Sequence, residues 1–143
     1  MAVQMMGKLS WDERFSVGVQ KYDDQHKVLF GYLGELYDAM RDKKEEEVVG
    51  EVLGKLLNYT LTHFFDEEIE LYKTNYPGYT RHKEAHDILV AAVREYFIRF
   101  RSGKEPGRKM LIEIIAVVTD WLNEHIGVVD KSYSAWLNSK GVK

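Results

Sequence analysis

The sequence contains no cysteine and only two prolines among its 143 residues. Without thiols the chain can form no disulfide, thiolate nucleophile, zinc ribbon or iron–sulfur cluster, so any bound metal must use nitrogen and oxygen ligands. Both prolines, Pro77 and Pro106, stand beside a glycine. They mark turns between long uninterrupted segments.

The chain also lacks an excess of positive charge and a long apolar run. A formal net charge of −3 and a pI near 6.0 provide no basic field for phosphate backbones, so nucleic acid is not expected as a partner. The first residues, MAVQMMGKLSW, lack the apolar core of a signal peptide. No segment approaches the roughly 18 uncharged residues of a membrane helix. We therefore expect no membrane association and a cytoplasmic protein.

The apolar content is nevertheless sufficient for one core. Hydrophobic residues make up 45% of the chain and charged residues 30%, which is typical of a globular protein. We predict a single domain over residues 1–143, because this length is usual for one domain. Residues 1–18 are expected to form an N-terminal arm across it, with Trp11 and Phe15 as anchors.

Apolar residues recur at three- and four-residue steps in four segments, which is the pattern of amphipathic helices. The predicted helices cover about residues 20–41, 46–74, 80–101 and 107–127, followed by a short C-terminal helix over about 130–138. No segment requires a strand. The prediction is an all-α fold, an antiparallel up-down-up-down four-helix bundle with an N-terminal arm and a short C-terminal helix.

All five histidines fall on the apolar faces of these helices: His26, His63, His82, His86 and His125. Residues four apart in a helix lie within about 40° of each other. His82 and His86 therefore point the same way, and so do His63 and Glu67. The pattern directs imidazoles and a carboxylate toward the core from all four helices.

Each of these residues alone has an ordinary explanation. The spacing of His82 and His86 is common in helices, His63 with Glu67 could be a hydrogen-bonded surface pair, and His26 could be a satisfied core histidine. Taken together, these explanations require five imidazoles and a carboxylate to be buried by chance. Isolated buried ionisable groups cost several kcal/mol unless they are paired or bound to a metal. The set therefore predicts a metal site inside the bundle.

The number of candidate ligands exceeds the four that one zinc ion takes, so two metals are indicated. A bridging group is then needed, and Asp130 is a second candidate carboxylate, five residues after His125. In a regular helix a five-residue step turns Asp130 about 140° away from His125. We therefore predict a π-bulge, or a helix end near Gly127, that returns Asp130 to the core.

These residues, in this order, resemble the hemerythrin family of non-haem di-iron oxygen-binding proteins. The matching positions are His26, His63 with Glu67, His82 with His86, and His125 with Asp130. The segments WDERFSVGVQKYDDQHKVLF and WLNEHIGVVD are similar to the arm and first helix of the bacterial branch and to the fourth-helix motif. The resemblance extends from about Trp11 to Leu137.

The resemblance implies a di-iron centre with an oxo or hydroxo bridge. One iron would be held by His82, His86 and His125 and the other by His26 and His63, with Glu67 and Asp130 bridging both. The second iron would be one ligand short, and dioxygen would bind there. Iron itself follows from the resemblance, because imidazole and carboxylate ligands suit several metals.

An apolar wall around the open position is also implied, formed by Phe30, Trp121, Leu122 and Ile126. Water and protons promote oxidation of the irons, so a dry pocket favours reversible binding. The same residues are ordinary core for a bundle. Polar groups that orient the imidazoles must exist, but the sequence does not identify them.

The leading functional hypothesis is an oxygen carrier, store or delivery protein, because the bundle fills the 143 residues and leaves none for an output module. One alternative is an oxygen or redox sensor or delivery module that acts through a protein partner. Another is a di-iron enzyme acting on peroxide, nitric oxide or ferrous iron. Ferritin-like di-iron enzymes use more carboxylates and fewer histidines, so we predict that the protein is not an enzyme.

The ligand assignment predicts that His82→Ala loses bound iron and bundle stability together. The substitution removes one of three imidazoles from an iron, and the remaining buried ligands then lack their compensating charge. Iron content per chain and the thermal unfolding midpoint measure the two effects. Retention of two irons per chain would contradict the assignment.

Overall fold

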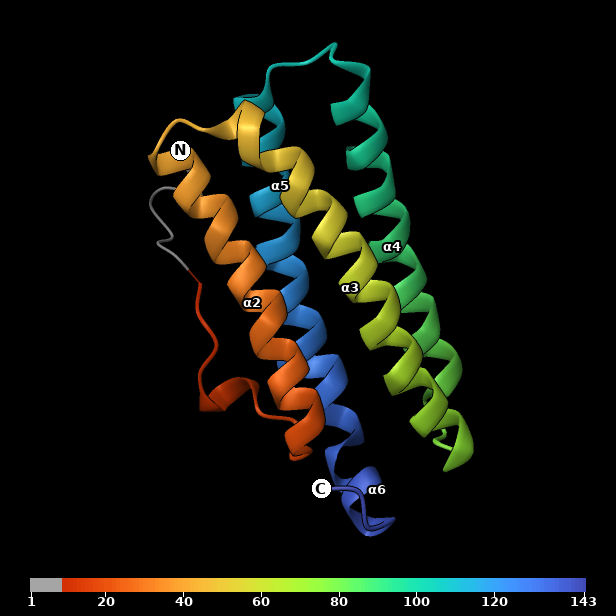
Figure 1. The fold of residues 1–143 in the computed structure, drawn as a ribbon. Coiled ribbons are helices and arrows are strands. Elements are labelled where there is room, and N and C mark those ends of the chain that lie inside the picture. Colours follow the sequence, from red (N-terminus) through yellow and green to blue (C-terminus); the bar gives the residue numbers. More distant parts are fainter. Residues whose placement is uncertain (1–8) are drawn as a thin grey trace.

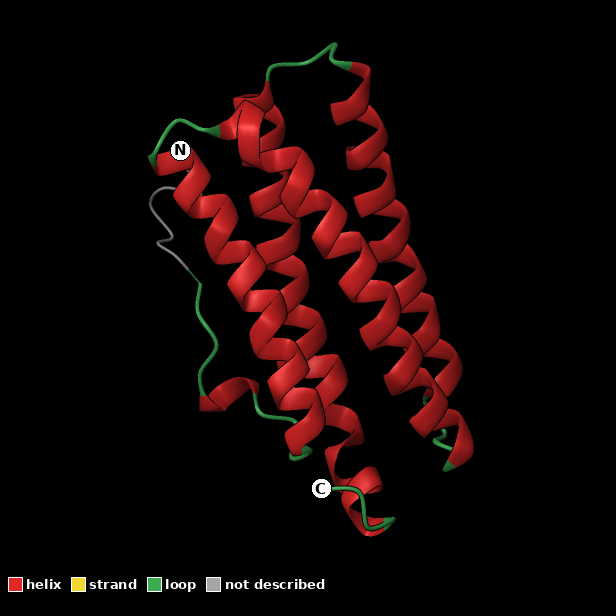
Figure 2. Cartoon of the chain, viewed as in Figure 1, coloured by secondary structure: helices red, strands yellow, loops and turns green. Residues whose placement is uncertain are grey.

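The computed structural model describes residues 9–143, in which four long helices lie side by side (Figure 1). They are α2 (Gln20–Arg41), α3 (Glu45–Lys73), α4 (Tyr79–Ser102) and α5 (Gly107–Trp121). Short connections make successive helices antiparallel, and residues 9–143 contain no strand (Figure 2). The predicted all-α bundle is confirmed. None of the helices in this part of the chain is both long and apolar enough to cross a membrane.

Local sequence accounts for the helix ends. The first turn of α3 is acidic, which is favourable at the positive end of the helix dipole, and one of its glutamates, Glu46, caps another helix. Its Oε1 atom accepts a 2.7 Å hydrogen bond from the N–H of Gly107, the first residue of α5. At the far end of α4, Gly103 adopts a φ of +66°, a left-handed conformation that glycine enters without strain. These contacts set the connections at one end of the bundle.

The N-terminal arm packs along α2, as Figure 1 shows for its described part. Residues 1–8 of the predicted arm lie outside the described residues. Phe15 is buried at the end of a single 3₁₀ turn, with its ring centroid 4.8 Å from that of Phe30, and Trp11 is half-buried. Asp23, near the start of α2, accepts hydrogen bonds of 2.7 and 2.8 Å from the arm. The arm is therefore fixed beside the first turns of α2.

Beyond α5 the chain stays helical but changes its hydrogen-bond pattern. A π-helix, η2 (Leu122–Val129), leads into a 3₁₀ helix, η3 (Asp130–Tyr133), and then into α6 (Ser134–Ser139). The N–H of Asp130 donates to the carbonyl of His125, the five-residue step that defines a π-helix. The predicted π distortion is confirmed. Regular α-helix ends at Trp121, earlier than the predicted residue 127.

The antiparallel arrangement divides the bundle interior into two halves. The end that holds the α2–α3 and α4–α5 connections is packed with fully buried apolar side chains, among them Leu33, Leu53, Met110, Leu111 and Ile115. The other end brings together the start of α2, the end of α3, the start of α4 and the π-helix (Figure 1). The histidines predicted to bind metal lie in these four segments.

Two leucines of α3 are expected to differ in how much they contribute to the free energy of unfolding. Leu53 is 0% exposed and Leu61 is 45% exposed. We expect Leu53→Ala to lower the free energy of unfolding by about 2–5 kcal/mol, because it leaves a cavity in the core. The matched control Leu61→Ala should change it by roughly 0.5 kcal/mol or less. Urea unfolding of the metal-free variants tests this, and equal losses would contradict the packing described.

Candidate metal centre

All seven predicted ligands are buried, with exposures of 0–3%, at one end of the bundle. They are His26 from α2, His63 and Glu67 from α3, His82 and His86 from α4, His125 from η2, and Asp130 from η3. Every long helix or its continuation contributes at least one of them. The bundle therefore brings together residues that are more than a hundred positions apart in the sequence, such as His26 and Asp130.

The side chains form two groups that share one carboxylate. Within each group the ligand atoms lie within 4.8 Å of one another: Glu67, His82, His86, His125 and Asp130 in the first, and His26, His63 and Glu67 in the second. Glu67 Oε1 lies 2.6 Å from His82 Nε2, whereas Oε2 lies 3.5 Å from the Nε2 atoms of both His26 and His63. One oxygen of Glu67 thus faces each group.

Asp130, at the start of η3, also lies between the two groups. Its Oδ1 atom lies 2.9 Å from His125 Nε2 and 3.1 Å from His82 Nε2. Its Oδ2 atom lies 3.2 Å from His26 Nε2 in the second group. The π-helix makes this possible, since His125 and Asp130 are one π turn apart and face the same side.

Several of these buried atoms have no hydrogen-bond partner within residues 9–143. They are both ring nitrogens of His26, the Nε2 atoms of His86 and His125, and both carboxylate oxygens of Asp130. Buried polar atoms without partners are rare and costly. Metal cations would satisfy the three Nε2 atoms and the two carboxylate oxygens together, so the residues present fit a two-metal site built from nitrogen and oxygen donors.

The electrostatics of the centre also favour bound cations. The surrounding imidazoles outweigh burial and hold the pKa values of Glu67 and Asp130 well below their ordinary range. Burial lowers the pKa of His26 and His82, but the two carboxylates more than reverse this and raise them to about 9 and 10. Burial, followed by the same carboxylates, raises the pKa of Tyr133 well above its ordinary value, so its phenol stays protonated. Protons on His26 and His82 therefore offset the two negative charges when no metal is bound, and metal cations would take the place of these protons.

Comparison with known protein families gives a match that covers most of this chain. Residues 17–137 match the model of the hemerythrin HHE cation binding domain. The chain belongs to the hemerythrin family. The matched range includes all seven candidate ligands, and the resemblance predicted from the sequence is confirmed.

Named relatives and a solved structure agree with membership of the hemerythrin family. The chain is 33% identical to a bacteriohemerythrin of Pseudomonas aeruginosa over 128 residues, covering 90% of this chain and 80% of that protein. It is 32% identical to a myohemerythrin of Sipunculus nudus, covering 89% and 92% of the two chains. A crystal structure of wild-type hemerythrin, 32% identical, superimposes with a TM-score of 0.79 over 90% of this chain and 97% of that one.

Two polar residues orient imidazoles in this hemerythrin fold, and the sequence did not identify them. His63 Nδ1 lies 2.6 Å from Gln25 Oε1, and His86 Nδ1 lies 2.8 Å from Glu68 Oε2. An acceptor at Nδ1 places the proton there and leaves the Nε2 lone pair facing the centre. The signal in the sequence is weak. Gln25 and Glu68 are merely the neighbours of His26 and Glu67.

Aromatic rings lie flat against two of the histidines in this hemerythrin. Phe64 stacks on His86 with ring centroids 3.7 Å apart, and Trp121 stacks on His125 at 4.2 Å. The sequence did not indicate that Phe64, which directly follows His63, contacts the site. Trp121 was predicted beside the open oxygen position, and the structure places it in contact with the first group. The other predicted pocket residues are buried: Phe30, Leu122 and Ile126.

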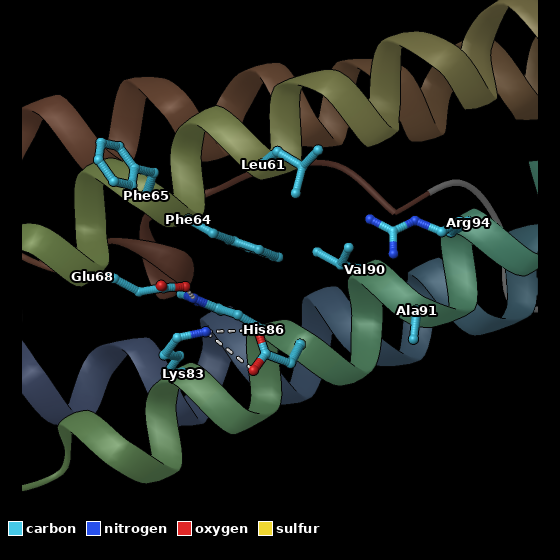
Figure 3. A pocket seen from close by; sticks show the side chains of 10 residues that line it. Leu61, Phe64, Phe65, Glu68, Lys83, His86, Val90, Ala91 and Arg94 are labelled. Carbon is cyan, nitrogen blue, oxygen red and sulfur yellow. Dashed lines mark hydrogen bonds and ion pairs between the residues drawn. The ribbon is translucent and has the colours of Figure 1, made fainter.

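A surface groove reaches the outer edge of the site between α3 and α4 (Figure 3). Its volume is about 440 Å³, and Phe64 and His86 line it. The side chain of Glu68 remains 17% exposed there, whereas that of His86 is 1% exposed. A pair formed by Lys83 and Asp87, 3.0 Å apart, lies on the same side. Water can therefore reach the orienting carboxylate, while the imidazole itself stays covered.

The contact between Gln25 and His63 predicts a specific loss of metal affinity. Gln25→Leu keeps the size of the side chain but removes the acceptor, so we expect affinity at the His63 group to fall by about 10–100-fold. The matched control is Gln20→Leu, because the side chain of Gln20 donates to the exposed Asp24 and not to a candidate ligand. Titration of metal into both variants measures the difference, and equal affinities would contradict an orienting role for Gln25.

Proposed function

We propose that the chain binds dioxygen reversibly at a non-haem di-iron centre and acts as an oxygen carrier, store or delivery protein. The observation that carries this proposal is the pair of buried ligand groups joined by Glu67 and Asp130. Both carboxylates lie within 3.5 Å of nitrogens from each group. Membership of the hemerythrin family supports iron as the metal and dioxygen as the ligand.

The ligand groups suggest how the residues would share two irons. His82, His86 and His125 would hold the first iron, His26 and His63 the second, and Glu67 and Asp130 would bind both. When bound, the two irons supply the electrons that make the uptake of dioxygen possible and reversible. The second group offers one imidazole fewer, so the open position for dioxygen is expected beside His26 and His63.

The protein's own part is to hold the ligands still and to keep the position dry. Gln25 and Glu68 fix the rings of His63 and His86 through their Nδ1 atoms. Leu122 and Ile126 are 1% and 0% exposed and separate the interior from solvent. Because water and protons promote oxidation of the irons, excluding water slows that oxidation and favours the release of dioxygen unchanged.

The balance of ligands supports a binding protein over an enzyme. Five neutral imidazoles and two carboxylates give less donor charge than the carboxylate-rich sites of ferritin-like di-iron enzymes. Weak donor charge disfavours the highly oxidised iron that oxygen-activating chemistry requires. An oxygen sensor or delivery module that acts through a protein partner would use the same reversible binding step. The cytoplasmic location stays a prediction from the sequence.

Reversibility is the property to test. Iron-loaded protein is reduced without air, exposed to oxygen and then freed of oxygen under vacuum, while its visible spectrum is recorded. We expect a charge-transfer band that appears with oxygen and disappears on its removal, over several cycles, because the pocket excludes water. Permanent oxidation in the first cycle, or turnover of an added oxidisable substrate, would contradict a carrier.

A further inference from the structure

One hydrogen bond inside the centre joins the shared carboxylate of Glu67 to a residue that is not a candidate ligand. The hydroxyl of Tyr133 donates to Glu67 Oε2 at 2.7 Å, and both residues are 0% exposed. Neither residue is exposed to bulk solvent, so bulk water does not compete for the phenol proton. A buried hydrogen bond to a carboxylate is stronger than a bond between neutral groups.

This hydrogen bond affects only one end of the shared carboxylate. Oε2 is the oxygen that faces His26 and His63, at 3.5 Å from each Nε2 atom. Oε1 faces His82 and His86, at 2.6 and 3.2 Å, and no hydroxyl group of the described residues 9–143 donates to it. The two groups of ligands therefore meet chemically different oxygens of the same side chain.

Asp130, the other shared carboxylate, lacks such a donor. Both of its oxygens are buried without a hydrogen-bond partner within residues 9–143. Asp130 would therefore give its full charge to bound cations, whereas Glu67 shares part of its charge with a phenol proton. The asymmetry depends on one side chain, Tyr133.

The backbone explains why Tyr133 is fixed in this place. Asp130 and Tyr133 are three residues apart in the 3₁₀ helix η3, where side chains at that spacing eclipse and face the same side. The ring of Tyr133 lies 5.5 Å from that of His82 and 6.1 Å from that of Tyr22. The π-helix that returns Asp130 to the core therefore also returns Tyr133.

We infer that Tyr133 is a positioning residue that weakens Glu67 as a donor to the metal held by His26 and His63 and thereby favours its reduced state. This inference rests on the proposed di-iron function. A hydrogen bond withdraws charge from the donor oxygen, and the more highly charged ferric ion loses more by this than the ferrous ion. The hydroxyl thus helps to keep the centre in the ferrous form that takes up dioxygen.

Tyr133→Phe tests the inference in the iron-loaded protein, because it removes the hydroxyl and keeps the ring. We expect the midpoint reduction potential to shift downward. The matched control is Tyr22→Phe, since Tyr22 is also buried but its hydroxyl contacts the carbonyl of Asp66 at 3.3 Å. That control should leave the potential unchanged. Mössbauer spectra of the Tyr133 variant should change at one of the two irons only.

A second variant tests the opposite direction and guards against misfolding. Placing 3-fluorotyrosine at position 133 makes the phenol a stronger donor in the same space, so the potential should shift upward. Unchanged potentials, equal shifts in the Tyr133→Phe and Tyr22→Phe proteins, or an upward shift in Tyr133→Phe would overturn the inference.

Iron content separates this inference from the proposed function. If the unaltered protein does not bind two irons per chain, the proposed function fails and the inference fails with it. If all proteins bind two irons but the potentials do not differ as described, only the role of Tyr133 is wrong. A purely structural role for Tyr133 would change stability without changing the potential.

Discussion

Glu67 and Asp130 are fully buried carboxylates in the interior of a helical bundle, and the rest of the structure depends on how their charges are balanced. An ionised carboxylate moved from water to such an interior is unstable unless cations or hydrogen-bond donors surround it. Here five imidazoles supply the surroundings, and several of their nitrogens remain without partners. Metal cations would satisfy these nitrogens and balance the two carboxylates together. Since the ligands come from every long helix or its continuation, the same cations would join the bundle together and couple its stability to metal content.

The need to return Asp130 to the core also shapes the C-terminal end of the chain. A π-helix is rare and mostly occurs as a single turn within an α-helix, so one of eight residues is uncommon. Its benefit is that His125 and Asp130 face the same interior. The following 3₁₀ turn adds Tyr133 to that face, and α6 then bonds back to the arm, where Asn138 donates to the carbonyl of Gly18. Site geometry and chain topology are thus linked through one irregular helix.

The sequence was sufficient for features that repeat along one helix. Apolar residues at three- and four-residue steps predicted the four helices. The four-residue spacings of His82 with His86 and of His63 with Glu67 predicted that these side chains face the core. The five-residue step to Asp130 even predicted a π distortion, because a regular helix cannot accommodate it.

Spacing along one helix does not predict contacts between different helices. Gln25 reaches His63 from another helix, and Tyr133 reaches Glu67 across 66 positions of sequence. Neither residue differs in type or spacing from ordinary surface or core residues. The stacking of Phe64 on His86 likewise depends on how α3 packs against α4. The positions of these side chains follow from tertiary packing, which a periodic pattern does not contain.

We expect two metal ions to share Glu67 and Asp130 inside the bundle. Crystals of the iron-loaded protein, measured on both sides of the iron absorption edge, test it directly through anomalous scattering. The account predicts two iron peaks per chain, one bonded to His82, His86 and His125 and one to His26 and His63, with a carboxylate oxygen of Glu67 and of Asp130 on each. A single peak, or two irons with Asp130 bound to neither, would contradict it.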